Sequence, residues 1–224
     1  MPATPTTSAT SGPHRPLRRD AERNRLRILQ AASAVFAERG LAASLDDVAR
    51  HAGVGVGTVY RRFRGKDDLI EALFEQKIEQ MVTIAREATA LPGAWQGLVS
   101  FMERATALQV ADLGLRQVLL SRGYGRDRVK RARSRLIPLI KQLVARAQEE
   151  GCLRPDVRYA DIPLILLMVS SVGAYTRGIE PEPWRRYLMV VLDGLGARRG
   201  QPPLAVGLPT DAQLDQAMGA GDRT

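Results

Sequence analysis

The segment from residue 44 to residue 66 concentrates side chains that can donate hydrogen bonds to nucleic acid. Threonine and tyrosine hydroxyls, guanidinium groups and ammonium groups are donors that proteins direct at phosphate oxygens and base edges. Gly55 and Gly57 in the same segment allow the backbone to approach a duplex closely. The residues that we expect to contact DNA are Ser44, Gly55, Thr58, Tyr60, Arg61, Arg62 and Lys66.

Each of these residues also has an ordinary structural explanation. Ser44 can act only as a helix cap, Tyr60 can be a surface aromatic, and arginines on a helix often face solvent. The distribution of charge favours DNA. Five cations and no acid occur from residue 50 to residue 66, six arginines and two acids occur from residue 15 to residue 27, and the net charge is +9. Two basic runs beside one motif indicate phosphate binding.

Two short helices joined by a tight turn must position these donors. Ser44 is suited to cap the first helix, because it precedes two aspartates that favour the positive end of the helix dipole. We expect this helix to end near Ala52, with Gly53 in the turn. The second helix should run from about residue 56 to residue 62 or 63. This layout is a helix-turn-helix, in which the second helix enters the major groove.

The same segment resembles the helix-turn-helix of the TetR family of bacterial transcriptional regulators. The resemblance covers about residues 22–75 and rests on residue types at fixed spacing, namely Ala31, Phe36, Gly40, Ala49, Ala52, Gly53, Val54, Gly57, Thr58, Tyr60, Phe63, Lys66 and Leu69. The chain departs from the family pattern at Ser44, Val48, Gly55 and Arg62, where threonine, isoleucine, serine, and histidine or tyrosine are usual. Without a serine hydroxyl at position 55, base readout should depend more on Arg61 and its neighbours.

Apolar residues at three- and four-residue spacing predict helices through the rest of the chain, and the fold class is therefore all-α. A long helix opens at Asp67 and ends before Pro92, and others are expected at residues 94–111, 113–122, 127–150, 158–178 and 182–198. We expect four regions: a disordered basic arm (1–19), a DNA-binding domain (20–66), a ligand-binding and dimerisation domain (67–200) and a flexible tail (201–224).

For the C-terminal domain, the resemblance implies a homodimer and a pocket for a small-molecule effector. Candidate lining residues are Met81, Trp95, Phe101, Met102, Leu119, Tyr124, Met168 and Tyr175. An aromatic content of only 5% favours a largely apolar effector. The last two helices would form a four-helix bundle across the dimer through Ile165, Val169, Val172, Trp184, Leu188, Val191 and Leu195. Both sets of residues could instead be the ordinary core of one chain.

The chain lacks the sets of residues that other classes of protein function require. Two histidines and the single cysteine, Cys152, have no metal-ligand spacing, and the chain shows neither a phosphate-binding glycine loop nor a nucleophile with a suitably spaced base. We therefore expect no cofactor and rank an enzyme below a sequence-independent architectural DNA-binding protein, which would also be basic. The longest apolar stretch, residues 164–169, is too short to span a membrane. The lone cysteine fits the reducing cytoplasm.

A third basic stretch occupies residues 122–135. Cations at the start of a helix oppose its dipole, so these residues are not explained by the stability of that helix. Two explanations remain open. The stretch is a solvated loop, or Arg126, Arg128 and Arg131 add to the positive field over DNA.

Overall fold

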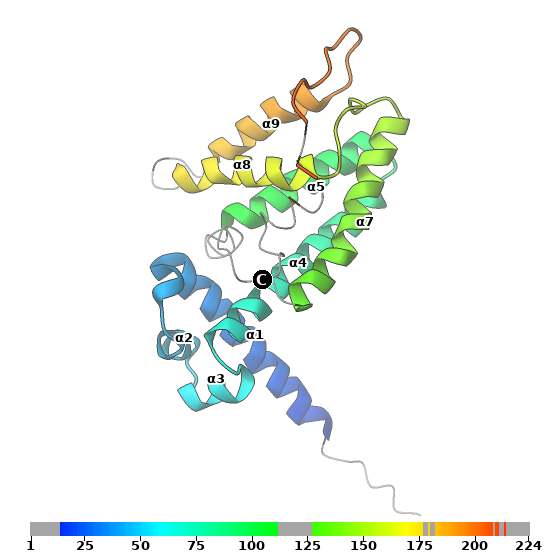
Figure 1. Cartoon of the computed structure of the whole chain (residues 1–224). Helices are drawn as coiled ribbons and strands as arrows, with labels where there is room; N and C mark the ends of the chain where they lie inside the picture. Colours follow the sequence, from blue (N-terminus) through cyan, green and yellow to red (C-terminus); the bar gives the residue numbers. More distant parts are fainter. Residues whose placement is uncertain are drawn as a thin grey trace, which may run out of the picture.

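The computed structural model describes residues 14–111, 127–176, 179, 182–207, 209, 210 and 213. Its helices are α1 (His14–Arg39), α2 (Leu45–Ala52), α3 (Val56–Arg62), α4 (Lys66–Thr89), α5 (Ala94–Ala111), α7 (Asp127–Glu149), α8 (Asp161–Tyr175) and α9 (Pro183–Leu195), with a short 3-10 turn η1 (Gly40–Ala42) after α1 (Figure 1). An isolated bridge pairs Leu153 with Gly196. The prediction of an all-α fold is confirmed.

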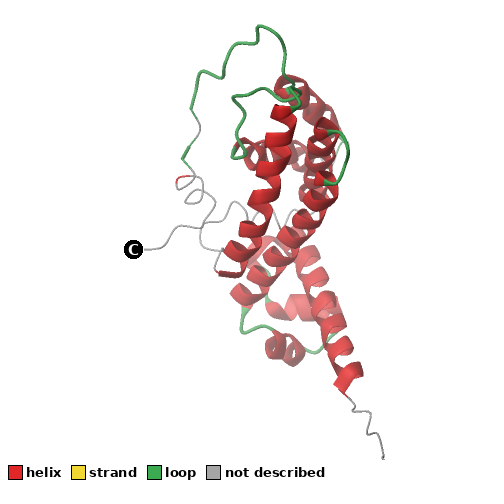
Figure 2. Ribbon diagram, turned by 90° about the vertical axis from the view of Figure 1, so that its right-hand side faces the viewer, coloured by secondary structure: helices red, strands yellow, loops and turns green. Residues whose placement is uncertain are grey.

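Helix α4 connects the two ends of the molecule. It packs on α1 at one end and on α5 and α7 at the other. Helices α1, α2 and α3 form the lower end in Figure 1, while α5, α7, α8 and α9 form the upper end. Figure 2 shows the same division from the side. A change in the upper helices therefore has a direct path, through α4, to the helix-turn-helix.

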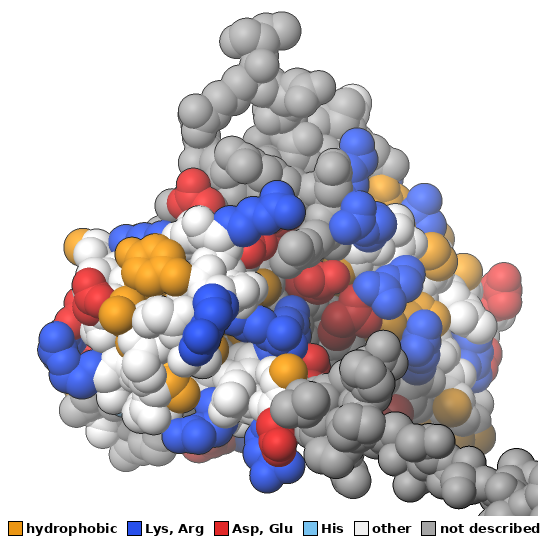
Figure 3. Space-filling model, turned by 90° about the horizontal axis from the view of Figure 1, so that it is seen from below, with side chains coloured by type: hydrophobic (Ala, Val, Ile, Leu, Met, Phe, Trp, Pro, Cys, Tyr) orange, Lys and Arg blue, Asp and Glu red, His pale blue; other side chains and the backbone are white. Residues whose placement is uncertain are grey.

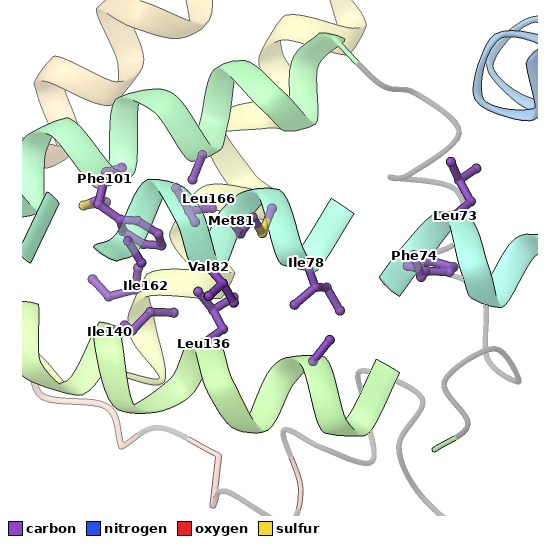
Figure 4. Packing of buried hydrophobic residues seen from close by; sticks show 14 of the residues in the cluster. Leu73, Phe74, Ile78, Met81, Val82, Phe101, Leu136, Ile140, Ile162 and Leu166 are labelled. Carbon is purple, nitrogen blue, oxygen red and sulfur yellow. The ribbon is translucent and has the colours of Figure 1, made fainter. Parts of the chain in front are cut away.

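A continuous set of buried apolar side chains runs through both ends. In the lower end it includes Phe36 of α1, Val48 of α2 and Val59 of α3. In the upper end, side chains of α4, α5, α7 and α8 meet, as Figure 4 shows for Met81, Phe101 and their neighbours. Burial of this apolar surface is the main force that holds the helices together.

Helix α7 holds the corner between α4 and α5. The guanidinium of Arg146 donates to the backbone carbonyls of Thr89 (2.7 Å) and Leu91 (3.3 Å), at and just beyond the end of α4. The carboxylate of Glu150 accepts from the backbone N–H of Ala94 (3.1 Å) at the start of α5. These two charges satisfy backbone groups that helix ends leave unpaired, and each has the sign that the helix dipole favours.

Gly97 allows the closest approach at this corner. A Cβ atom at this position would lie 2.7 Å from the carbonyl oxygen of Ala88 and 3.4 Å from a methyl group of Leu143. Helices α4, α5 and α7 can therefore meet here only because residue 97 has no side chain.

Several expected boundaries differ from those of the structure. Helix α1 begins at His14, so residues 14–19 of the expected disordered arm are helical, in a segment rich in helix-forming arginine. Helix α8 begins at Asp161 because the carboxylate of Asp161 accepts from the backbone N–H of Arg158 (2.7 Å) and holds a turn before the helix. Helices α8 and α9 also end three residues before the expected positions. The helix expected at residues 113–122 lies outside the described residues.

Part of the chain beyond Gly200 is held against the C-terminal domain. The guanidinium of Arg154 donates to the carbonyl of Pro202 (2.8 Å), and the carboxylate of Asp156 accepts from the backbone N–H of Leu204 (2.7 Å). Arg154 and Asp156 also form a two-point ion pair at 2.6 and 2.8 Å. The hydrogen bonds from Arg154, followed by the one from the backbone N–H of Leu204, lower the pKa of Asp156 to about 2. Residues 202–204, expected in a flexible tail, are thus anchored.

Candidate nucleic-acid interface

The turn between α2 and α3 is positioned by an arginine of α1. Gly53 adopts a left-handed backbone conformation, with φ 64°, and ends α2. The Arg27 guanidinium donates to the carbonyl of Ala52 (2.9 Å), and a Cβ atom at Gly53 would lie 3.4 Å from the same guanidinium. Sequence reasoning did not identify this role for Arg27, because one arginine among six carries no local signal of what it contacts.

The start of α2 is a complete capping box. The Oγ of Ser44 accepts from the backbone N–H of Asp47 (3.1 Å), and the Asp47 carboxylate accepts from the backbone N–H of Ser44 (3.0 Å). The pKa of Asp47 is lowered, first by the hydrogen bond from the Ser44 hydroxyl and further by the positive charges of Arg39 and Arg50. The prediction that Ser44 caps this helix is confirmed, and its side chain is exposed.

Helix α3 is anchored on one face and open on the other. Val59 and Phe63, which follows the helix, are buried in the core. Tyr60, the residue after Val59, is 56% exposed. Gly55 and Gly57 have no atoms within 4 Å of a Cβ position, so the backbone at the start of α3 is open to a partner. The helix can therefore enter a groove without disturbing its own packing.

The arginines at the end of α3 have different surroundings. The guanidinium of Arg61 donates to the Thr58 hydroxyl (3.2 Å), so these two candidate contacts lie side by side. Arg62 pairs with Glu22 of α1, with 3.6 Å between guanidinium and carboxylate. Glu22 is a second residue that sequence reasoning missed. Lys66 lies half-buried at the first residue of α4, close to the end of α3 in the chain.

The lower end of the molecule presents many cations. Figure 3 shows Lys and Arg side chains across the face seen from below, with fewer acidic side chains between them. Of the third basic stretch, Arg131 is exposed on α7, Arg128 falls within the same helix, and Arg126 lies outside the described residues. Whether this stretch contacts DNA stays a hypothesis.

The candidate pocket residues fall into three groups. Met81, Phe101 and Met102 are buried in the C-terminal core, and Trp95 packs at its edge. Leu119 and Tyr124 lie outside the described residues. Met168 and Tyr175 are 54% and 88% exposed on α8, so the expectation that they line an interior pocket is wrong.

The candidate dimer residues also differ in how deeply they are buried in the single chain. Val169, Trp184, Leu188 and Leu195 are buried within the single chain, so they do not form an outer face, and this expectation is corrected. Trp184 packs beside Gly173 of α8, where a Cβ atom would lie 3.2 Å from the indole ring. The remaining three, Ile165, Val172 and Val191, are only partly buried.

A different stripe of α8 and α9 faces outward. Leu164, Met168, Ser171 and Tyr175 repeat at three- and four-residue spacing on α8 and are half-buried or exposed. On α9, the exposed Tyr187 and Val190 share one face opposite the buried leucines. We call the apolar set formed by Leu164, Met168, Tyr175, Tyr187 and Val190 the outer face.

The described residues of the chain contain neither a metal-binding group nor a membrane-spanning helix. Among these residues, no three His, Cys, Asp or Glu side chains come together as a group that could hold a metal ion. None of the described helices combines the length and apolar character needed to cross a membrane.

Comparison with known proteins gives two family matches. Residues 28–73 match the family described as bacterial regulatory proteins, tetR family. Residues 92–197 match the C-terminal domain of SbtR-like transcriptional regulators. The first match covers the helix-turn-helix, and the second covers α5 to α9.

Individual relatives agree with these matches. The repressor KstR2 of Mycobacterium tuberculosis is 28% identical over 188 residues, which cover 75% of this chain and 90% of KstR2. A crystal structure of a TetR transcription regulatory protein from Mycobacterium vanbaalenii is 36% identical, with a TM-score of 0.59, over 81% of this chain and all of that one. FadR of Bacillus subtilis, solved with stearoyl-CoA, shares the fold at 18% identity, with a TM-score of 0.63, over 75% of this chain and 95% of FadR. The chain belongs to the TetR family of DNA-binding transcriptional regulators, which is not a family of enzymes.

Proposed function

We propose that this regulator binds a palindromic operator as a homodimer, represses transcription there, and is released by a small, largely apolar molecule that fills its C-terminal domain. The observation that carries the proposal is the division of α3 into a buried anchor and an open face. Val59 is fully buried, whereas Tyr60 and the backbone at Gly55 and Gly57 are accessible. Such a helix is built to present one side to a partner.

The outer face supports the homodimer. Large apolar side chains that gather on the surface of a soluble protein commonly mark a site that binds another protein. Met168 and Tyr187 are 54% and 50% exposed, and Tyr175 is 88% exposed. A second copy of the chain would cover these side chains and would place two α3 helices on one duplex, about 34–36 Å apart for half-sites one helical turn from each other.

The character of the core supports an apolar effector. Among the described buried residues, Arg154 is the one with a charged side chain, and it is paired with Asp156. Thr106, Gln109 and Ser170 are buried but uncharged, and Ser170 donates to the side-chain carbonyl of Gln109 (3.0 Å) across α5 and α8. The family offers precedents of matching character, because KstR2 is a ketosteroid regulator and FadR was solved with stearoyl-CoA.

Helix α4 is the proposed path of coupling. Because α4 packs on α1 below and on α5 and α7 above, an effector that shifts the upper helices also moves the helix-turn-helix. The effector would favour a conformation in which the two α3 helices are wrongly spaced for the operator. Such coupling is typically worth about 1–3 kcal/mol, or about 5- to 150-fold in affinity.

A mobility-shift titration with the DNA upstream of the gene for this protein tests the proposal. With unrelated competitor DNA in excess, the wild type should give a discrete shifted band. Tyr60→Ala should weaken this band by about 5- to 150-fold, the range expected for loss of one specific contact. Tyr60→Phe keeps the ring and should lose less. A wild-type signal that competitor erases at every candidate promoter would contradict a specific regulator.

The same assay then examines the effector. Stearoyl-CoA and a ketosteroid are suitable first compounds, because they represent the two kinds of ligand named for relatives. An active compound should release the band from wild-type protein in a saturable manner. An architectural DNA-binding protein would instead show similar affinity for all sequences, whereas specific binding usually exceeds non-specific binding by about 10³- to 10⁷-fold.

A further inference from the structure

Val56 of α3 is an apolar side chain that the protein leaves at its surface. It is 39% exposed, whereas Val54, two residues earlier, packs against the apolar core. Apolar side chains also lie among the cations on the face of the molecule shown in Figure 3. A single exposed valine is common on protein surfaces, so its exposure alone assigns it no role. The residues on either side distinguish this valine from others.

Glycines flank Val56 on both sides, and the fold of this chain requires neither of them. Beyond their immediate chain neighbours, no described atom lies within 4 Å of a Cβ position at Gly55 or Gly57. Gly55 has a φ of −65° and Gly57 is helical, so neither needs the conformational freedom of glycine. Within a helix, glycine is less favourable than alanine. What the two glycines provide is room for a partner to reach Val56 from either side.

Val56 shares a face of α3 with Tyr60. Residues four apart in a helix point in nearly the same direction, and Tyr60 is 56% exposed. The open side of α3 therefore carries a phenol and, one turn away, the two methyl groups of Val56. Valine is branched at Cβ and has one strongly preferred rotamer in a helix. The Val56 side chain thus loses little conformational freedom when it meets a partner.

The group in the major groove that fits these methyl groups is another methyl group. Each base pair presents its own set of donors and acceptors there, and among the four bases thymine adds an apolar group, the methyl on C5. The other base edges are polar, and a valine packed against them would leave a donor or acceptor without its hydrogen bond. An apolar side chain on the open face of α3 therefore favours thymine at the position that it contacts.

We propose that Val56 selects a thymine in each half-site of the operator by packing against its C5-methyl group. This inference rests on the proposed function, since it assumes that α3 lies in the major groove. Val56 adds an apolar contact to the hydrogen bonds expected from the polar side chains of α3. Because residues 55 and 57 have no side chains, the base edge reaches Val56 without meeting another group of the protein.

Replacement of thymine by uracil tests the proposal, because it removes the methyl group and keeps the hydrogen-bonding groups of the base. A sequence that the wild type binds specifically is first selected from random duplexes. Each thymine of its half-site is then replaced by uracil, in both half-sites together. At least one replacement should weaken wild-type binding by about 10- to 20-fold, since burial of each methyl group is worth about 4-fold and two half-sites are changed.

Variants of the protein show which side chain reads the methyl group. Val56→Ala removes both γ-methyl groups and should bind the thymine and uracil duplexes with nearly equal affinity. Val206→Ala is the matched control, because it deletes the same groups from a side chain that is 86% exposed in the segment after α9, and it should keep the full difference. Tyr60→Phe should also keep the difference, which separates Val56 from the aromatic ring on the same face.

The outcomes separate this proposal from the proposed function. If the wild type binds every uracil duplex as well as the thymine duplex, or if Val56→Ala keeps the wild-type difference, the proposal is overturned while specific DNA binding stands. If the wild type enriches no sequence, the proposed function fails and this inference fails with it. Because Val56 is exposed, Val56→Ala should not lower the unfolding temperature, so its loss of discrimination would not reflect misfolding.

Discussion

At the start of α2, Ser44 and Asp47 each satisfy the other's backbone N–H group. Sequence reasoning identified Ser44 as the cap because a serine before two acids at a helix start has a clear physical role. It could not identify Arg27, which donates to the carbonyl of Ala52 in the turn, or Glu22, which pairs with Arg62. Their partners lie in other helices, and no spacing rule within one segment encodes such contacts.

Replacement of Ser44 by alanine should destabilise the protein. The backbone N–H of Asp47 loses its acceptor, and loss of an N-cap typically costs about 1 kcal/mol of unfolding free energy. Denaturant unfolding of Ser44→Ala and of Ser134→Ala measures this. Ser134 lies within α7 and bonds only a carbonyl of its own helix, so its replacement should be nearly neutral. Equal effects of the two substitutions would contradict the importance of the cap.

The same variant predicts a dependence on pH. The Ser44 hydroxyl is the largest cause of the lowered pKa of Asp47, so the charged carboxylate stabilises the folded state. For a lowered pKa, this contribution is complete above the usual value of 3.8 and is lost as pH falls through the lower folded value. The difference in unfolding free energy between wild type and Ser44→Ala should therefore shrink below about pH 4. A difference that is constant from neutral to strongly acidic pH would contradict this assignment.

At the scale of elements, the periodicity of apolar residues predicted most helices well. Helix α5 was expected at residues 94–111 and is found at Ala94–Ala111. The direction that α8 and α9 face was harder to predict. Helix α8 is apolar on nearly all sides, so its sequence does not tell which side meets the core and which meets a second chain. The structure places Trp184 and Leu188 inward and leaves Met168 and Tyr187 outward.

The contact of α4 with α5 gives a prediction at this scale. Gly97→Ala should destabilise the protein by about 1–3 kcal/mol, because overpacked sites force neighbours to shift. The new methyl group would lie 2.7 Å from the carbonyl oxygen of Ala88, which is backbone and cannot rotate away. Gly57→Ala is the matched control in α3. No atom lies within 4 Å of its Cβ position, so it should gain about 0.5–1 kcal/mol from helix propensity. Thermal unfolding without DNA compares the two.

At the scale of the whole molecule, assembly depends on surfaces that the sequence patterns do not separate from the core. The candidate interface residues were chosen by their helical stripes, and four of the seven are buried within one chain. Helix α5 contacts α8 and α9 on their other side, and this packing determines which side of the two helices faces outward. By contrast, the family resemblance predicted the division into a helix-turn-helix and a C-terminal helical domain, because that division follows from local motifs.

A charge on the outer face should therefore prevent dimer formation. Met168→Glu should shift the protein from dimer to monomer in sedimentation equilibrium, because burying an unpaired carboxylate in an apolar interface is costly. Its thermal unfolding should stay cooperative, since Met168 is 54% exposed in the single chain. Leu26→Glu introduces the same charge at a site on α1 that is 39% exposed, and should leave the dimer intact. A dimer that persists in Met168→Glu would place the interface elsewhere.

The anchoring of residues 202–204 has a consequence for how the chain is made. Arg154 leaves the ribosome 48 residues before Pro202, whose carbonyl it binds. At about 5–20 residues per second, these 48 residues take about 2 to 10 seconds to synthesise. Helices α1 to α4 are already complete during this interval, whereas the C-terminal domain still lacks its last closing contacts. A nascent chain can therefore complete the helices of its helix-turn-helix seconds before the last contacts of its C-terminal domain can form.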